Sequence, residues 1–223
     1  MLRRADIPVP LLLAGALLAG CGAPGHRAAE EHGPWLALQT PATAAAWSVV
    51  SFGGEGEVEF LEDGVRLGFG VALTGVRWDA DGLPDGAALP RDGYELELRA
   101  TRLGGNDFFC GLSFPVGDGA LSLVLGGWGG SLVGLSCLDG ADASSNETTC
   151  FRRFESGREY AVRVRVADGR VRAWLDGERV VDAVVAGRRC ELRAEIVPGG
   201  PFGLAAFQTA AELRGLRLRR LRP

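Results

Sequence analysis

The 223-residue sequence predicts an all-β fold, built as one antiparallel sandwich. Apolar and polar residues alternate along many short segments, which is the period-two pattern of half-buried strands. Turn signals, many of them Asp-Gly, separate these segments about every 8 to 12 residues, as in a sandwich or barrel. No apolar stripe with helical spacing runs longer than about two turns, and no internal repeat indicates a propeller or solenoid.

About a dozen strands are expected along the chain. The first clear hairpin joins 57–61 to 65–69 through an Asp-Gly turn. In segment 160–166, apolar side chains share one face and arginines share the other. The other expected strands are 94–99, 108–114, 121–125, 171–175, 180–181, 203–207 and 213–221.

Residues 1–20 have the three-part layout of a secretory signal peptide. Arg3 and Arg4 are followed by an apolar stretch over 11–18 and then by small residues. This apolar stretch is shorter than the roughly 20 residues that a membrane-spanning helix needs. We therefore expect an exported protein.

The segment Leu18-Ala19-Gly20-Cys21 resembles the lipobox of bacterial lipoproteins, in which the cysteine is lipidated and becomes the new N-terminus. An ordinary signal peptide followed by a chance cysteine is the alternative. Gly22, in place of aspartate, permits passage to an outer membrane by analogy with the Gram-negative sorting rule. Residues 21–45 are expected to be a flexible tether and 46–223 the folded domain, so the only membrane contact expected is the lipid on Cys21.

Charge and histidine content exclude several classes of function. All 24 basic residues are arginines scattered over the strands, and the net charge is −4, so no basic patch for nucleic acid is expected. The only histidines, His26 and His32, fall in the expected tether. A domain without histidine has no Ser-His-Asp triad and no His-ligated zinc, so a general acid or base would be Asp, Glu, Tyr or Cys.

Three regions in order, 93–108, 160–177 and 203–221, resemble the concanavalin-like, laminin-G-like jelly rolls. They resemble more closely the 3-keto-disaccharide hydrolase family, and the resemblance covers about 50–223. It implies a jelly-roll sandwich with a sheet face that binds sugars. Longer family members carry an aromatic and acidic loop where this chain has only 126–154. This shortening favours a non-catalytic or weakly catalytic carbohydrate-recognising module, held on the cell surface by lipid.

Trp128, within Gly126–Gly130, is the first candidate for a sugar-binding residue. An exposed indole between glycines would stack on a sugar ring, whereas a core tryptophan packed against glycines is the alternative. Asn106 and Asp107 stand at a strand start, which the resemblance places at the rim of the sugar-binding face, although turn chemistry alone also explains them. Asn106, Trp128 and Trp174 form the expected ligand-binding set.

An enzyme acting on 3-keto-glycosides is the alternative function that the resemblance implies. A ketone acidifies the neighbouring C–H bond, so a base and an oxyanion stabiliser would suffice. Asp107 or Glu147 would be the base, and Arg99 or Arg102 the stabiliser. A structural envelope protein without a small ligand is the third hypothesis, and nothing in the sequence indicates an oligomeric state.

Residues 138–149 are the most polar stretch of the domain. Its oxygen-bearing side chains make it a candidate calcium site, with Asp139, Asp142, Asn146 and Glu147 as ligands. The spacing is not that of an EF-hand, and a solvated loop without metal is the alternative.

Four cysteines remain after the lipidation candidate. Export makes disulfides available to them. Cys137 and Cys150 flank the polar loop and are the expected disulfide pair. Cys110 lies in an apolar strand and is expected to be a buried hydrophobic residue, like many free cysteines.

Overall fold

The structure, a computed structural model, describes residues 32–222 of the chain. The expected signal peptide, Cys21 and the first part of the expected tether lie outside the described residues. In the part of the chain that is described, no helix is long and apolar enough to cross a membrane.

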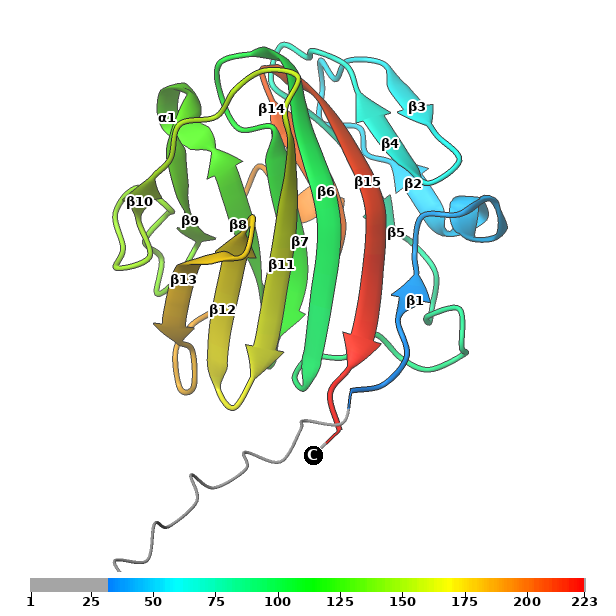
Figure 1. Ribbon diagram of the computed structural model, residues 1–223, viewed down its shortest axis with the longest axis vertical. Coiled ribbons are helices and arrows are strands. Elements are labelled where there is room, and N and C mark those ends of the chain that lie inside the picture. Colours follow the sequence, from blue (N-terminus) through cyan, green and yellow to red (C-terminus); the bar gives the residue numbers. More distant parts are fainter. Residues whose placement is uncertain (1–31, 223) are drawn as a thin grey trace, which may run out of the picture. The chain divides into compact units, whose positions relative to one another are not determined.

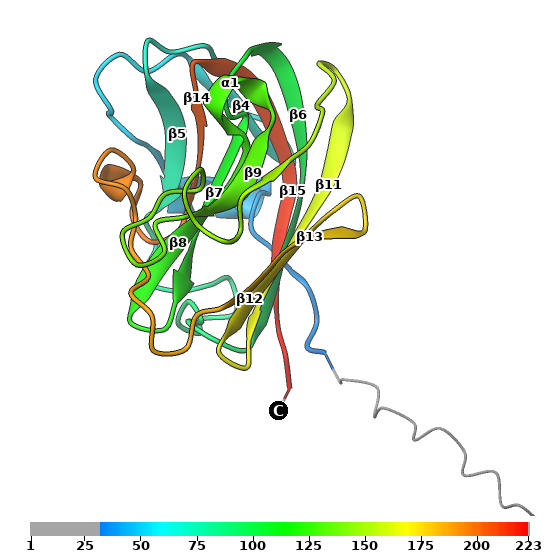
Figure 2. The ribbon, with the colours of Figure 1, turned by 90° about the vertical axis from the view of Figure 1, so that its left-hand side faces the viewer.

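Two antiparallel sheets pack face to face, as Figure 1 and Figure 2 show. The eight-stranded sheet has the order β13-β12-β11-β6-β15-β4-β3, with β1 paired to β15. Its strands are β1 (Leu36–Ala37), β3 (Val58–Phe60), β4 (Gly64–Leu67), β6 (Tyr94–Gly105), β11 (Glu159–Ala167), β12 (Arg170–Leu175), β13 (Glu178–Val184) and β15 (Thr209–Arg220). The predicted all-β jelly-roll sandwich is confirmed.

The seven-stranded sheet has the order β10-β9-β8-β7-β14-β5-β2. Its strands are β2 (Trp47–Val49), β5 (Leu73–Trp78), β7 (Cys110–Val116), β8 (Gly119–Gly126), β9 (Leu132–Ser136), β10 (Cys150–Phe151) and β14 (Gly203–Phe207). Three short helical segments complete the described residues: η1 (Pro41–Ala46), α1 (Gly127–Gly130) and η2 (Val197–Gly199).

One main core lies between the sheets and is built from the alternate residues that the period-two pattern indicated. Tyr94, Leu96 and Leu98 of β6 are buried in it together with Phe114 of β7. The Tyr94 hydroxyl donates a hydrogen bond to the carbonyl oxygen of Pro115 at 2.5 Å. Burial raises the pKa of Tyr94 well above its usual value, so this hydroxyl stays protonated and links the two sheets.

Two of the predicted Asp-Gly turns close hairpins with left-handed backbone at both central residues. Asp168 and Gly169 have φ of 57° and 64°, and Asp176 and Gly177 have φ of 50° and 82°. Consecutive positive φ angles are the mark of the type I′ turn, whose twist matches that of the flanking strands. These turns position β11, β12 and β13 side by side (Figure 1).

The folded domain begins earlier than the predicted boundary at residue 46. β1 pairs with β15, and Leu38, which follows β1, is fully buried. His32 pairs with Leu221 just beyond the end of β15. The prediction of a tether is therefore wrong for residues 32–45, because their backbone and apolar side chains complete one edge of the sandwich. The domain also contains one histidine, where none was expected.

The predicted disulfide between Cys137 and Cys150 is wrong, because both thiols are free in the structure. Cys150 pairs with Val133 of β9. Cys137 lies four positions after Val133, which places it about 13 Å further along the strand direction. A disulfide spans at most about 7 Å between Cα atoms. Cys110 and Cys190 are free as well, and burial raises the pKa of Cys110 to about 12, as for an inert core thiol.

Arginine–carboxylate pairs on the strands predict how stability depends on pH. Hydrogen bonds from Arg170 and Arg214 lower the pKa of Asp182 and Glu212, respectively. A lowered folded-state pKa contributes stability that is complete above the unfolded value, about 4, and is lost as the pH falls through the folded value. We expect Tm to change little from pH 8 to about 5 and to fall below about pH 4.

Thermal unfolding followed by circular dichroism across this pH range tests the expectation. The variant D182N, which cannot lose a charge at this position, should show a flatter acid slope than the parent. A steep loss of Tm already between pH 7 and 5 would contradict the assignment to these carboxylates.

Candidate functional site

An open hollow lies on the outer face of the seven-stranded sheet. Its floor is made by outward-facing residues of β7, β8 and β9, namely Gly111, Ser122, Val124 and Ser136. Their immediate strand neighbours point the other way, into the main core. Because most of the floor side chains are short, the sheet face is recessed here, and the hollow has a volume of about 240 Å³.

Two chain segments cover the sheet face beside the hollow. In one, the segment after β13 packs Ile196 against Leu73 and Ala205. In the other, the polar loop packs Ala143 against Val124. Figure 2 shows the first segment, in orange, on the outer side of the seven-stranded sheet. The hollow is the part of the sheet face between these two segments that neither of them covers.

Aromatic rings and charged side chains form the walls of the hollow. Phe108 and Phe207 stack with ring centroids 5.9 Å apart, and Trp128 lines the same space. The charged members are Asp107, Arg193 and Glu195. This combination of apolar rings with a few polar groups is typical of a small-molecule site.

Trp128 stands on a turn whose backbone conformation favours glycine. Within α1 and its cap, Gly126, Trp128, Gly129 and Gly130 all have positive φ, which L side chains other than small polar ones rarely adopt. Trp128 is 44% exposed, so the expectation of an exposed residue is confirmed and the core alternative is wrong. The Asp107 carboxylate accepts a hydrogen bond from the Gly129 N–H at 3.4 Å and ties the turn to the start of β7.

Arg102 packs beneath this turn. Its guanidinium donates to the carbonyl oxygen of Gly130 at 2.7 Å and lies 5.1 Å from the ring centroid of Phe109 and 5.8 Å from that of Phe154. A Cβ atom at Gly126 would come within 2.5 Å of Arg102 Nη2. The predicted oxyanion stabiliser is therefore a support of the turn and does not line the hollow that Trp128 lines.

Arg193 links the two coverings of the sheet face. It forms ion pairs with Glu195 at 3.1 Å and with Asp142 of the polar loop at 3.4 Å. The hydrogen bond from Arg193 lowers the pKa of Glu195 and raises that of Arg193. Glu195 therefore remains a carboxylate at neutral pH, able to accept hydrogen bonds from a ligand.

The structure brings some of the predicted site residues together and separates the others. Asp107 and Trp128 line one hollow, and Asn106 is exposed immediately before Asp107. Trp174 and Arg99 instead line a groove on the outer face of the eight-stranded sheet. There Trp174 stacks against the guanidinium of Arg163 at 4.1 Å. The expected binding set is thus reduced to the residues around the turn.

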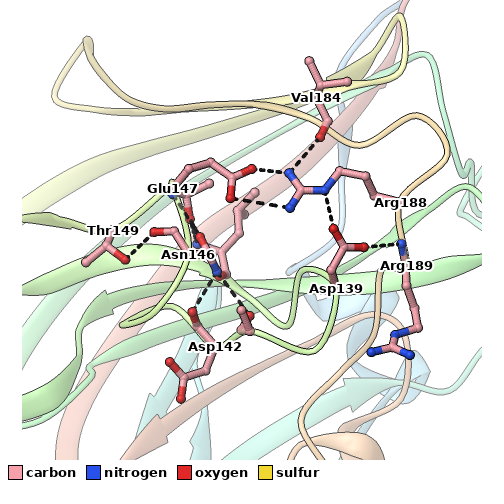
Figure 3. Close-up of polar contacts among 11 residues, drawn as sticks. Asp139, Asp142, Asn146, Glu147, Thr149, Val184, Arg188 and Arg189 are labelled. Carbon is pink, nitrogen blue, oxygen red and sulfur yellow. Dashed lines mark hydrogen bonds and ion pairs between the residues drawn. The ribbon is translucent and has the colours of Figure 1, made fainter.

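The expected base Glu147 lies on the polar loop and is engaged by Arg188. Figure 3 shows the Arg188 guanidinium between the carboxylates of Glu147 and Asp139. The hydrogen bond from Arg188 lowers the pKa of both carboxylates. Because Glu147, Asp107 and Arg99 lie on different parts of the domain, the predicted catalytic set does not assemble.

The polar loop does not fit the expected calcium site. The Asp142 carboxylate accepts hydrogen bonds from the N–H and the hydroxyl of Ser144. The Asn146 amide donates to the Asp142 carbonyl oxygen at 2.7 Å (Figure 3). Asp139 is bound to Arg188, as described. In the described residues, no group of three or more His, Cys, Asp or Glu side chains is arranged to hold a metal ion. The oxygen atoms that would bind calcium are occupied by donors of the protein itself.

Similarity to solved structures supports the fold assignment. The structure is similar to a protein of unknown function with a galectin-like fold from Bacillus subtilis, with a TM-score of 0.55 at 11% identity over 86% of this chain and 97% of that one. It is also similar to the exoplasmic/lumenal domain of VIP36 in a Ca2+/Man3GlcNAc-bound form, with a TM-score of 0.53 at 13% identity over 86% of this chain and 92% of that one. No protein-family model and no curated protein matches the chain. The fold is a galectin-like jelly roll.

Sequence reasoning missed the wall that the C-terminal half of the domain contributes. Phe207, Arg193, Glu195 and Ile196 line the hollow but come from β14 and from the segment before it. Apolar and polar residues do not alternate in segment 189–200, so no strand is indicated there. The one available signal for a site was a charged pair two residues apart, Arg193 and Glu195. Its position over β5 and β14 depends on the sheet order, which local patterns do not give.

Gly126 and Gly129, on either side of Trp128, differ in the space that is available for a side chain, because only Gly126 contacts Arg102. Gly129 has φ of 86° with open space around its Cα, whereas a Cβ at Gly126 (φ 80°) would overlap Arg102. We expect G129A to cost about 1 kcal/mol of unfolding free energy, from the left-handed backbone alone. G126A should cost at least about 1 kcal/mol more, because the guanidinium must leave its place.

Urea denaturation of both variants measures the difference, with G129A as the matched control. Equal losses in the two variants would contradict the close packing of Arg102 beneath the turn.

Proposed function

We propose that this domain is a carbohydrate-recognising module that binds a sugar in the hollow on the seven-stranded sheet. The observation that carries the proposal is the exposed Trp128 indole beside the polar groups of that hollow. A pyranose has apolar C–H faces and a rim of hydroxyl groups, and an indole is suited to cover one such face. Holding an indole open to solvent on a strained turn has no role in stabilising the core.

The polar groups of the hollow match the hydroxyl rim of a sugar. The hydroxyl of Ser136 and the carboxylates of Asp107 and Glu195 are acceptors, and Arg193 is a donor. The volume of about 240 Å³ lies below the roughly 300–1,000 Å³ of sites for drug-sized ligands. The hollow therefore suits one ring at a time, with the rest of a glycan outside it.

The similarity to the VIP36 domain supports a sugar ligand. That domain has this fold and is described in a form bound to Ca2+ and Man3GlcNAc. The fold relation comes without close sequence identity, so the main support for a sugar ligand here is the exposed tryptophan and its polar neighbours.

Binding without hydrolysis accounts for the site better than the 3-keto-glycoside hydrolase activity that the sequence resemblance implies. Asp107 lies in the hollow, but Glu147 and Arg99 lie elsewhere. Glu195, the other carboxylate of the hollow, has a lowered pKa through Arg193, which is unfavourable for a general acid.

Replacement of Trp128 tests the binding proposal. Loss of the stacking surface in W128A should weaken sugar binding by more than about 2 kcal/mol, roughly thirtyfold. Because the ring is exposed, the unfolding free energy should change by no more than about 0.5 kcal/mol. A glycan array identifies the ligand, and isothermal titration calorimetry then compares the variants.

W174A is the matched control, since Trp174 stands on the other sheet. It should bind the sugar as the parent does. Equal losses in W128A and W174A, or undiminished binding by W128A, would move the site away from this hollow.

We further propose that the module is exported and anchored to the cell envelope by a lipid on Cys21. The support is the lipobox-like segment that ends at Cys21 and the signal-peptide layout before it. Intact-mass measurement of membrane-extracted protein should show a chain that begins at Cys21 and carries acyl groups. A soluble chain that begins at another residue would overturn the anchor, as would retention of the lipid in C21A.

A further inference from the structure

A second hollow, of about 410 Å³, shares the Trp128 turn. Trp128 lines the hollow on the seven-stranded sheet, whereas the neighbouring Gly129 and Gly130 line this second one. We name it the Arg102 hollow. Its other lining residues are Arg102, Ser131, Phe151, Arg152, Arg153 and Phe154. A ligand that lies across the turn would contact both hollows.

Arg102 brings a buried positive charge to this hollow. The residue is only 7% exposed, and among the described residues it forms no ion pair with a carboxylate, although the charge of Asp107 acts on it. The neutral carbonyl of Gly130 and the rings of Phe109 and Phe154 are its contacts, and Nε has no hydrogen-bond partner. Burial lowers the pKa of Arg102, yet an arginine stays protonated at neutral pH. Only the Coulombic attraction of Asp107 acts on this charge, and no carboxylate forms an ion pair with it.

Arg153 adds a second positive charge at the rim of the Arg102 hollow. It is exposed, and the described residues give it no ion pair or hydrogen bond. Arg152 differs, because it is paired with Glu178 at 2.5 Å. Most other arginines on this domain have carboxylate partners, so two arginines without an ion pair in one hollow favour an anion from outside the chain. Phe151, 65% exposed, offers an apolar surface beside them.

We propose that the Arg102 hollow binds an anionic group of a glycan, a sulfate ester or a uronate carboxylate, while a neighbouring ring of that glycan stacks on Trp128. This assignment rests on the proposed function and names its ligand class as acidic glycans. A guanidinium forms charge-assisted hydrogen bonds to oxyanions, which are about twice as strong as neutral ones. The shared turn explains how one oligosaccharide reaches both Trp128 and Arg102.

Inorganic sulfate is the probe for the anion site alone. We expect sulfate to shift the NMR resonance of the Arg102 Nε–H and the amide of Gly130 in a saturable way, and chloride at equal ionic strength to leave them unchanged. The variant R153S should weaken this response, and R163S, which removes a half-buried arginine of β11 from a different groove, should not. An unchanged Arg102 resonance on addition of sulfate would overturn the anion site.

A sulfated oligosaccharide and its desulfated counterpart test the glycan assignment by calorimetry. The sulfated form should bind about tenfold tighter at low salt, and the advantage should shrink as salt screens the charges. In R153S the advantage should fall while the affinity for the desulfated form and the Tm stay unchanged.

Equal affinities of the two forms would overturn the acidic-glycan assignment and leave neutral-sugar binding standing. A response to inorganic sulfate without any gain from the sulfated oligosaccharide would also overturn it, as a free-anion site. Failure of both oligosaccharides, with Trp128 unperturbed, would count against the proposed function itself.

Discussion

Every second side chain of each strand must enter the core that the two sheets share, and this constraint decides what each outer face carries. On the eight-stranded sheet the outward positions hold long charged side chains that pair across strands. Arg219 donates to Glu95 at 2.7 Å, and Arg217 donates to Glu97 at 2.6 Å. On the seven-stranded sheet many outward positions are glycine, alanine or serine, such as Ser122. Short side chains leave the space in which an uncharged ring can lie against the sheet.

The sequence predicted the parts of the fold that depend on local chemistry. Alternation located the strands because a half-buried strand has no other way to separate apolar from polar side chains. Asp168-Gly169 and Asp176-Gly177 predicted hairpin turns because few other residue pairs accept positive φ at both central positions. The same reasoning predicted that Trp128 is exposed, because the glycines on either side of it indicate a turn that leaves the sheet. The sequence alone therefore predicted the fold class and one residue of the candidate site, Trp128.

The rest of the candidate site and the possible disulfide depend on how distant segments and strands are paired, which local sequence patterns do not specify. Cys137 and Cys150 flank one loop, but the pairing of β9 with β10 sets them on positions too far apart for a bond. The acidic side chains of the polar loop look like metal ligands until Arg188 is placed beside them by the segment after β13. Arg193 and Glu195 reach the hollow by the same route. Contacts between segments about fifty residues apart decided the last two of these outcomes.

The turn under Trp128 violates the local rules that the rest of the domain obeys. Trp128 has φ of 47°, a conformation that costs a bulky residue about 1–3 kcal/mol. Arg102 is desolvated beneath it, with a peptide carbonyl and two aromatic rings in place of a carboxylate. Both features reduce stability, and both would be removed by ordinary turn residues and an apolar side chain. Natural domains keep such violations where they position a group for a ligand. We infer that here the positioned groups are the solvent-exposed Trp128 indole and the Arg102 guanidinium, which has no ion pair with a carboxylate.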